Sequence, residues 1–144
     1  YKDYTDLALA LDSVRRRWSG AEVVATCATG GRPDMALSVL GLLAGYEDAP
    51  IWIAEDKVVA RVLHAGESWT IEGAEGKTFS IIAIAPNTEV SEHGLEWELD
   101  HSPLGLLADT GISNIVRSTA EIEVHTGTAI AYLLHQGFIG TVCE

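Results

Sequence analysis

Cysteine and basic residues are scarce in this 144-residue sequence, and long apolar runs are missing altogether. No stretch approaches the roughly 18 apolar residues that a membrane-spanning helix needs, so the sequence predicts no membrane span. The two cysteines, Cys27 and Cys143, form no tight pattern and favour a reducing cytoplasm over a disulfide scaffold. Only 9 Lys and Arg face 21 Asp and Glu, and the net charge of −12 argues against broad nucleic-acid binding. We therefore expect a cytoplasmic protein that binds neither membranes nor nucleic acids.

The sequence begins with Tyr1 rather than methionine and carries no secretory signal. We expect Tyr1 to begin a fragment, or a chain whose first part is missing. The length fits one ordinary domain or two small ones. Apolar residues make up 47% of the chain, which is enough to bury a core.

The first third of the chain alternates helix and strand signals. An amphipathic helix is predicted from Leu7 to Trp18, with Thr5 as its N-cap. A buried strand is expected at 22–27, a second helix at 33–44 and another short strand at 51–54. This order is typical of an α/β sheet.

After residue 56 the pattern changes to β. Segments rich in β-branched residues are separated by glycine and proline turns, which favours a β-sandwich. Residues 128–135 fit a strand or a short helix, and we favour the strand. We place the domain boundary between 1–55 and 56–144. The other predicted strands are 57–64, 68–72, 78–85 and 119–125.

Two carboxylates, Asp3 and Asp6, lie at the start of the first predicted helix. Acids there interact well with the helix N-terminus, so capping alone explains them. The alternative is a magnesium site, because Mg²⁺ is usually held by one or two carboxylates together with phosphates and waters.

The stretch ATGGRPDMALSVL joins the first predicted strand to the second helix. Gly30 and Gly31 allow a ligand to approach the backbone closely, and Arg32 suits a bidentate contact with phosphate. Asp34 would bind a metal or a ribose hydroxyl, or hold Arg32 in place. The plain alternative is a tight turn with an internal Arg–Asp pair. The stretch matches neither the P-loop nor the dinucleotide-binding fingerprint.

Four motifs occur together and in order: KDYTD (Lys2–Asp6), GGRPD (Gly30–Asp34), GLEWEL (Gly94–Leu99) and ISN (Ile112–Asn114). This combination resembles the thiamine pyrophosphokinase family along essentially the whole chain. The resemblance implies an incomplete N-terminal α/β nucleotide-binding domain followed by an all-β sandwich domain that helps to bind thiamine. It further implies transfer of pyrophosphate from ATP to thiamine, giving thiamine diphosphate and AMP, by a homodimer with its substrate pocket at the subunit interface.

The resemblance also assigns roles to individual residues. Asp3 and Asp6 would bind Mg²⁺, and together with Arg32 and Asp34 they would form the catalytic set. The nucleotide would lie against Gly30, Gly31, Arg32 and Asp34. Thiamine would contact Trp97, Ser113 and Asn114, since an aromatic face suits a thiazolium cation and the other two offer polar groups. Without the resemblance, Trp97 reads as a core residue and the two polar residues as a turn.

The sequence departs from the family pattern in three places. The acidic motif GDxDS that precedes KDxTD is absent, Met35 stands where the family often has His or Gln, and Leu9 where it often has Lys. Met35 and Leu9 both fit the apolar faces of helices, and in that case they would only change how those faces pack. The other interpretation is reduced activity, which leaves a thiamine-binding module without catalysis as an alternative. A related kinase acting on another small heterocyclic alcohol is a further one.

The five histidines show no zinc-ligand spacing, so we expect no zinc site. His93 and His101 flank the GLEWEL motif and could line a pocket, but surface positions are the simpler expectation. The remaining three are His64, His125 and His135.

Overall fold

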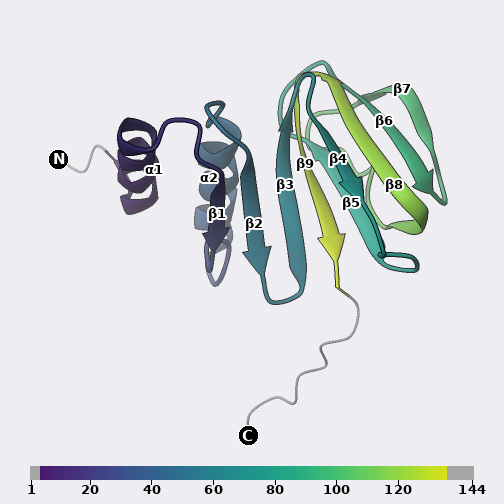
Figure 1. The fold of residues 1–144 in the computed structure, drawn as a ribbon, viewed down its shortest axis with the longest axis horizontal. Coiled ribbons are helices and arrows are strands. Elements are labelled where there is room, and N and C mark those ends of the chain that lie inside the picture. Colours follow the sequence, from purple (N-terminus) through teal and green to yellow (C-terminus); the bar gives the residue numbers. More distant parts are fainter. Residues whose placement is uncertain (1–3, 136–144) are drawn as a thin grey trace, which may run out of the picture.

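The structure is a computed structural model that describes residues 4–135. Asp3 and Cys143 therefore lie outside the described residues. Within them the chain forms mostly β-sheet, with two helices near the N-terminus (Figure 1). The helices are α1 (Asp6–Arg17) and α2 (Pro33–Ala44). The strands are β1 (Val23–Thr26), β2 (Ile51–Glu55), β3 (Val58–His64), β4 (Ser68–Ile71), β5 (Thr78–Ala83), β6 (Thr88–Leu95), β7 (Leu99–Leu104), β8 (Asn114–Thr126) and β9 (Thr128–Leu134).

Helix α1 begins as its sequence predicts. The Thr5 hydroxyl accepts a hydrogen bond from the backbone N–H of Ala8 at 3.2 Å, which confirms the predicted N-cap. An acid in the first turn and Arg15–Arg17 in the last turn suit the helix dipole. The helix buries Leu11 against the rest of the chain and ends at Arg17, with Trp18 as its C-cap.

Helix α2 connects β1 to β2, which lie side by side in parallel. Pro33 occupies the first turn, where its missing N–H costs nothing, and Val39 and Leu43 are buried. These residues form the smaller of two core clusters, together with Ile51 and Ile53 of β2. The expected helix and strand order of the first third is therefore present.

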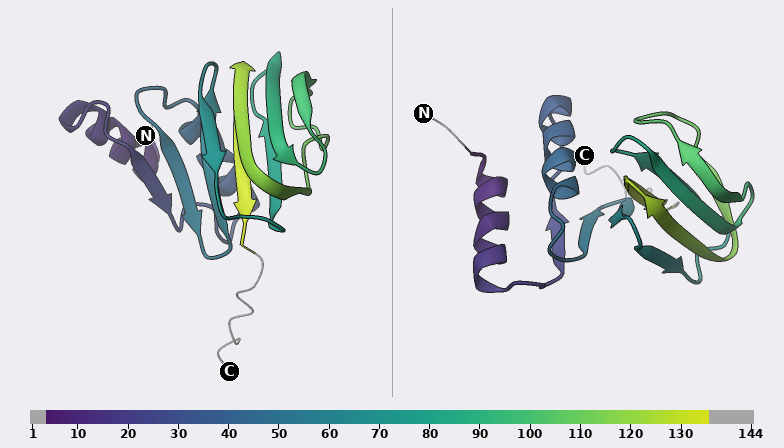
Figure 2. Two further views of the ribbon diagram at one scale, coloured as in Figure 1. Left: turned by 45° about the vertical axis from the view of Figure 1, so that its right-hand side comes forward. Right: turned by 90° about the horizontal axis from the view of Figure 1, so that it is seen from above.

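The sheet does not stop at the predicted domain boundary. β2 pairs antiparallel with β3, which in turn pairs with β9, so one sheet runs from β1 into the β-rich part. Seen from above, the helices cover the β1–β2 end and leave the far end to strands alone (Figure 2). A division of the chain into an α/β domain and a β domain stays a prediction.

The long strand β8 joins two layers of strands. Its first residues pair with β5, and the rest pairs with β4 and β6. The layer β3–β9–β5 and the layer β4–β8–β6–β7 enclose the larger core, which includes Phe79, Ile81 and Ile122. This agrees with the sandwich predicted for the second half, including the choice of strand for β9.

Sequence patterns missed β6 and β7 and placed the start of β8 too late. β6 carries Glu89, Ser91 and Glu92 without apolar alternation, and β7 contains Pro103. Both strands follow from cross-strand pairing rather than from local propensity. Among the described residues, no helix is long and apolar enough to cross a membrane.

Candidate functional site

The first helices meet at a hollow of about 310 Å³ near their N-termini. Asp6 from α1 and Asp34 from α2 both line it, together with Thr5, Met35 and Ser38. The fold thus brings two predicted carboxylates, 28 positions apart in sequence, to one place. Two carboxylates beside one hollow fit the usual protein contribution to a Mg²⁺–phosphate site.

Met35 and Leu9 do not pack into the core. Met35 is 49% exposed and Leu9 is 53% exposed. The expectation that they simply repack apolar helix faces is therefore wrong. Met35 instead contributes an apolar side chain to the wall of the hollow that holds Asp6 and Asp34.

Arg32 and Asp34 pair with each other at the start of α2. The guanidinium donates two hydrogen bonds to the carboxylate, at 3.1 Å from Nε and 2.5 Å from Nη2. The hydrogen bond from Arg32 holds the pKa of Asp34 below its usual value. Both side chains are exposed, so this is the internal pair that the plain interpretation anticipated. Gly31 has a φ of 82°, which only glycine adopts easily, while Gly30 borders open space.

Glu55 supports this turn from the neighbouring strand, and sequence reasoning missed it. Its Oε1 accepts hydrogen bonds from the backbone N–H of Ala28 at 2.9 Å and from the N–H and hydroxyl of Thr29, each at 3.2 Å. Desolvation raises the pKa of Glu55, but these hydrogen bonds together outweigh it and lower the pKa. A signal existed: β1 and β2 are adjacent parallel strands, so the ends of both meet at one sheet edge.

Within residues 4–135, no three His, Cys, Asp or Glu side chains gather closely enough to hold a metal ion. Asp3, the other predicted magnesium ligand, lies outside this range. The assignment of Asp3 and Asp6 as metal ligands stays a prediction.

A second, smaller hollow of about 90 Å³ lies beside the turn between β6 and β7. Trp97 and Asn114, both predicted to contact thiamine, line it. The indole side chain is 62% exposed, so the interpretation of Trp97 as a core residue is wrong.

Asn114 fixes the backbone of this turn. Its Oδ1 accepts from the backbone N–H of Trp97 at 3.1 Å and from that of Ile115 at 2.9 Å. Its Nδ2 donates to the carbonyl of Trp97 at 2.6 Å. Gly94, near the end of β6, has a φ of 75°, and a Cβ there would lie 2.1 Å from the carbonyl oxygen of Thr119. The turn that presents Trp97 is therefore rigidly defined by these contacts.

Ser113 does not line this hollow, although its neighbour Ile112 does. Its backbone N–H donates to the Ser80 hydroxyl at 3.0 Å, and its φ of 62° is left-handed. Ile112 also lines an open apolar hollow of about 300 Å³ over Ile82, Tyr132 and Leu134. The predicted contact of Ser113 with thiamine stays a prediction.

The hollow also contains Glu92, which the sequence did not identify. Glu92 is 1% exposed, and burial raises its pKa to about 7, although a hydrogen bond from Asn114 works in the opposite direction. In the sequence it stands among polar residues of β6, which suggests a solvated edge. Only the pairing of β6 with strands on both sides turns the residue inward.

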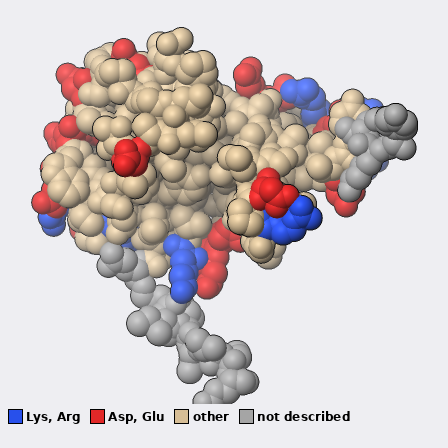
Figure 3. Space-filling view, turned by 180° about the vertical axis from the view of Figure 1, so that it is seen from behind, with Lys and Arg blue, Asp and Glu red and all other residues tan. Residues whose placement is uncertain are grey.

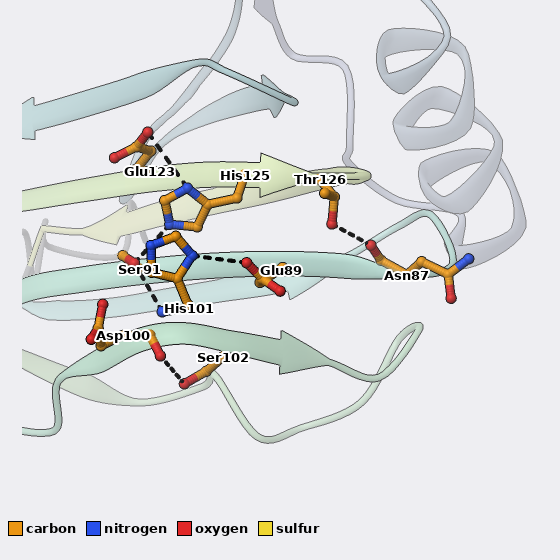
Figure 4. Close-up of polar contacts among 9 residues, drawn as sticks. All are labelled: Asn87, Glu89, Ser91, Asp100, His101, Ser102, Glu123, His125 and Thr126. Atoms are coloured by element: carbon orange, nitrogen blue, oxygen red, sulfur yellow. Dashed lines mark hydrogen bonds and ion pairs between the residues drawn. The ribbon is translucent and has the colours of Figure 1, made fainter.

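Two histidines far apart in sequence stack on each other at another place, on β7 and β8 (Figure 4). The ring centroids of His101 and His125 are 3.9 Å apart. Ser91 Oγ contacts His125 Nε2 at 2.7 Å, and Glu89 Oε1 contacts His101 Nδ1 at 2.9 Å. A hydrogen bond to Glu89 raises the pKa of His101. His93 lines a separate hollow together with Ser91 and Glu121. Neither His93 nor His101, the two histidines that flank the GLEWEL motif, is among the described residues that line the Trp97 hollow.

Comparison with known proteins shows what the second half of the chain resembles. Residues 68–130 match the family model described as thiamin pyrophosphokinase, vitamin B1 binding domain. These residues include the whole of the Trp97 hollow. This part of the chain is similar to the vitamin B1 binding domain of the thiamin pyrophosphokinases.

Individual relatives agree with this. Thiamine pyrophosphokinase 1 of Arabidopsis thaliana is 28% identical over 125 residues, which cover 81% of this chain and 47% of the plant protein. Among solved structures, thiamin pyrophosphokinase from Geobacillus thermodenitrificans gives a TM-score of 0.78 at 25% identity and covers 96% of this chain and 65% of that one. Thiamine pyrophosphokinase from Bacillus subtilis shares the fold, with a TM-score of 0.77 at 22% identity. The match covers 95% of this chain and 66% of the Bacillus subtilis chain. The chain thus spans about half the length of its curated relative and about two thirds of these bacterial structures.

Proposed function

We propose that the chain belongs to a cytoplasmic thiamine pyrophosphokinase. The observation that carries the proposal is the hollow built by Trp97 and Asn114 inside the segment that matches the vitamin B1 binding model. The enzyme would transfer the pyrophosphoryl group of ATP to the hydroxyethyl arm of thiamine. The products are thiamine diphosphate and AMP.

In this proposal the hydroxyl oxygen of thiamine attacks the β-phosphorus of ATP, and AMP leaves. The protein's contribution is positioning and neutralisation of charge. Mg²⁺, when bound, would offset phosphate charge, and Asp6 with Asp3 would hold it. The hydroxyl proton would pass to a carboxylate of the same group.

The turn at 30–34 would face the phosphates. Arg32 would leave Asp34 to make a bidentate contact with phosphate, since a guanidinium matches either partner in geometry. Gly30 and Gly31 would let the nucleotide approach the backbone. The present Arg32–Asp34 pair would thus hold the guanidinium close to the hollow that Asp6 also lines.

We also propose that the working form is a homodimer. The hollow of Asp6 and Asp34 and the hollow of Trp97 share no residue, and the helices and strands β6 and β7 lie at opposite ends of the molecule (Figure 1). One chain would therefore not bring both substrates together. A second copy could complete the site, and the apolar hollow at Ile82 and Tyr132 offers it a surface.

Replacing Asp6 by Asn tests the catalytic part of the proposal. We expect formation of AMP from ATP and thiamine to fall at least tenfold, while the dissociation constant for thiamine changes little, because Asp6 lies away from the Trp97 hollow. Asp12→Asn, on the same helix but outside the Asp6 hollow, is the control and should keep turnover. Unchanged turnover in Asp6→Asn would remove Asp6 from the metal site.

A thiamine-binding module without catalysis is the second candidate. One observation favours it: the guanidinium of Arg32 is already paired with the carboxylate of Asp34. It predicts thiamine binding without AMP release. Binding of ATP without thiamine would instead favour a related kinase acting on another small heterocyclic alcohol.

A further inference from the structure

Glu92 forms the inner wall of the Trp97 hollow. Its strand, β6, is paired on both sides, with Leu99 of β7 and Ile122 of β8 opposite Glu92. The side chain is 1% exposed, so the carboxyl group lies within the protein and not at its surface. Carboxyl groups are rarely buried in this way without a partner.

The two oxygens of this carboxyl group differ. Oε2 accepts a long hydrogen bond of 3.4 Å from Asn114 Nδ2. Oε1 is buried and has no hydrogen-bond partner among residues 4–135. No ion pair in that range involves Glu92, and the raised pKa of the group has the same origin, burial without a cation. The fold therefore keeps a free acceptor at this place at a cost to its stability.

The hollow gives a ligand access to that region. Its volume of about 90 Å³ exceeds several times the roughly 10–15 Å³ that one water needs. It has room for one edge of a small heterocycle, while the rest of the molecule would lie on the exposed face of Trp97. Leu99 and Ile112 supply apolar walls.

Asn114 cannot recognise a ligand edge in the same way. Its oxygen already accepts from two backbone N–H groups, and its nitrogen donates to the carbonyl of Trp97 and to Glu92. The buried side-chain polar atom that lines this hollow without a hydrogen-bond partner among residues 4–135 is Glu92 Oε1.

We propose that Glu92 is the specificity-determining residue of the hollow, and that its Oε1 accepts a hydrogen bond from the amino group of the aminopyrimidine ring of thiamine. This inference rests on the proposed function. A ligand with a carbonyl oxygen in place of the amino group would bring a second hydrogen-bond acceptor next to Glu92 Oε1. The two oxygens would repel each other, and Oε1 would still lack a donor. A site built around one hydrogen bond rejects such an analogue more strongly than it rejects a change in size.

Calorimetric titration of the full chain with thiamine and with its 4-oxo pyrimidine analogue tests the inference. At pH 8, above the pKa of about 7 for Glu92, we expect the wild-type chain to bind thiamine about ten- to hundredfold more tightly than the oxo analogue, the range for one hydrogen bond to a charged group. In Glu92→Gln the preference should shrink to a few-fold, because a carboxamide can turn either its oxygen or its nitrogen toward the ligand. The matched control is Glu121→Gln, an exposed glutamate of β8 that does not line the hollow, and it should keep the preference.

The outcomes separate this inference from the proposed function. Equal binding of both compounds by the wild-type chain would overturn the role of Glu92 and leave thiamine binding intact, and this result needs no variant. A preference that survives unchanged in Glu92→Gln would do the same. Binding of neither compound by the folded wild-type chain would overturn both proposals.

Discussion

At the scale of single residues, Glu92 makes the stability of the fold depend on pH. Its pKa in the folded protein is about 7, above the value of 4.5 expected in the unfolded chain. The folded state therefore binds the proton more tightly. The stabilisation that protonation gives is complete below about pH 4.5 and is lost as the pH rises through 7.

This predicts a pH-dependent effect of Glu92→Gln, which cannot ionise. Relative to the wild type, the variant should gain about 3 kcal/mol in free energy of unfolding between pH 4 and pH 8, from about 1.4 kcal/mol for each unit between 4.5 and 7. Urea unfolding at the two pH values measures the gain. Glu121→Gln, the exposed control, should show no comparable gain. If the difference in free energy of unfolding between Glu92→Gln and the wild type were the same at both pH values, the raised pKa of Glu92 in the folded protein would be contradicted.

Residue-level reasoning from sequence found several positions of the candidate site but not this one. Asp6 and Asp34 could be predicted because each stands at the start of a helix with a recognisable beginning. That they share a hollow follows from how α1 and α2 pack. Glu92 could not be predicted, because nothing in β6 itself says which side chains face inward.

At the scale of elements, Asn114 holds the turn between β6 and β7 in place. Asn114→Ala removes three hydrogen bonds to the backbone at Trp97 and Ile115 and leaves those part-buried groups without this partner. We expect a loss of about 2–4 kcal/mol in free energy of unfolding.

Hydrogen exchange locates this effect within the fold. In Asn114→Ala the backbone N–H of Trp97 should exchange much faster, because its acceptor is gone. The exchange rates of the N–H groups in the centre of the β3–β9 ladder should change only as far as the global stability of the protein changes. These groups serve as the internal control. Equal change at both places would show that Asn114 does not act on the turn in particular.

The elements of this fold were predictable to different degrees. Strong local signals, such as the Thr5 cap, Pro33 in the first turn and the β-branched strands β3, β5 and β9, predicted their elements closely. β6 and β7 lack alternation and owe their conformation to neighbours from other parts of the chain. The extension of β8 back to Asn114 has the same cause, since its first residues pair with β5.

At the scale of the whole molecule, charge is spread unevenly over the surface. Seen from behind, a broad region of the β-rich end is uncharged, and acidic groups lie mainly around its margin (Figure 3). Apolar side chains of β5 and β9 form an open hollow of about 300 Å³. Contact with a second copy would remove this apolar surface from water and so favour association.

Leu134→Asp tests whether this surface joins two copies. Leu134 is 37% exposed and lines the apolar hollow, so a charge there should convert a dimer to a monomer in sedimentation equilibrium. Leu37→Asp is the control, since Leu37 is 61% exposed on α2 and lies outside that hollow. A wild-type chain that sediments as a monomer at all concentrations would contradict the proposed homodimer.

The central claim is that the Trp97 hollow binds thiamine, and a thiamine titration of the folded chain tests it most directly. We expect saturable binding in the wild type that is lost or weakened at least tenfold in Trp97→Ala. Trp18→Ala is the matched control, because Trp18 is 59% exposed against 62% for Trp97 but lies at the end of α1, and it should bind as the wild type does. Absence of binding by the wild type, or equal binding by both variants, would contradict the account.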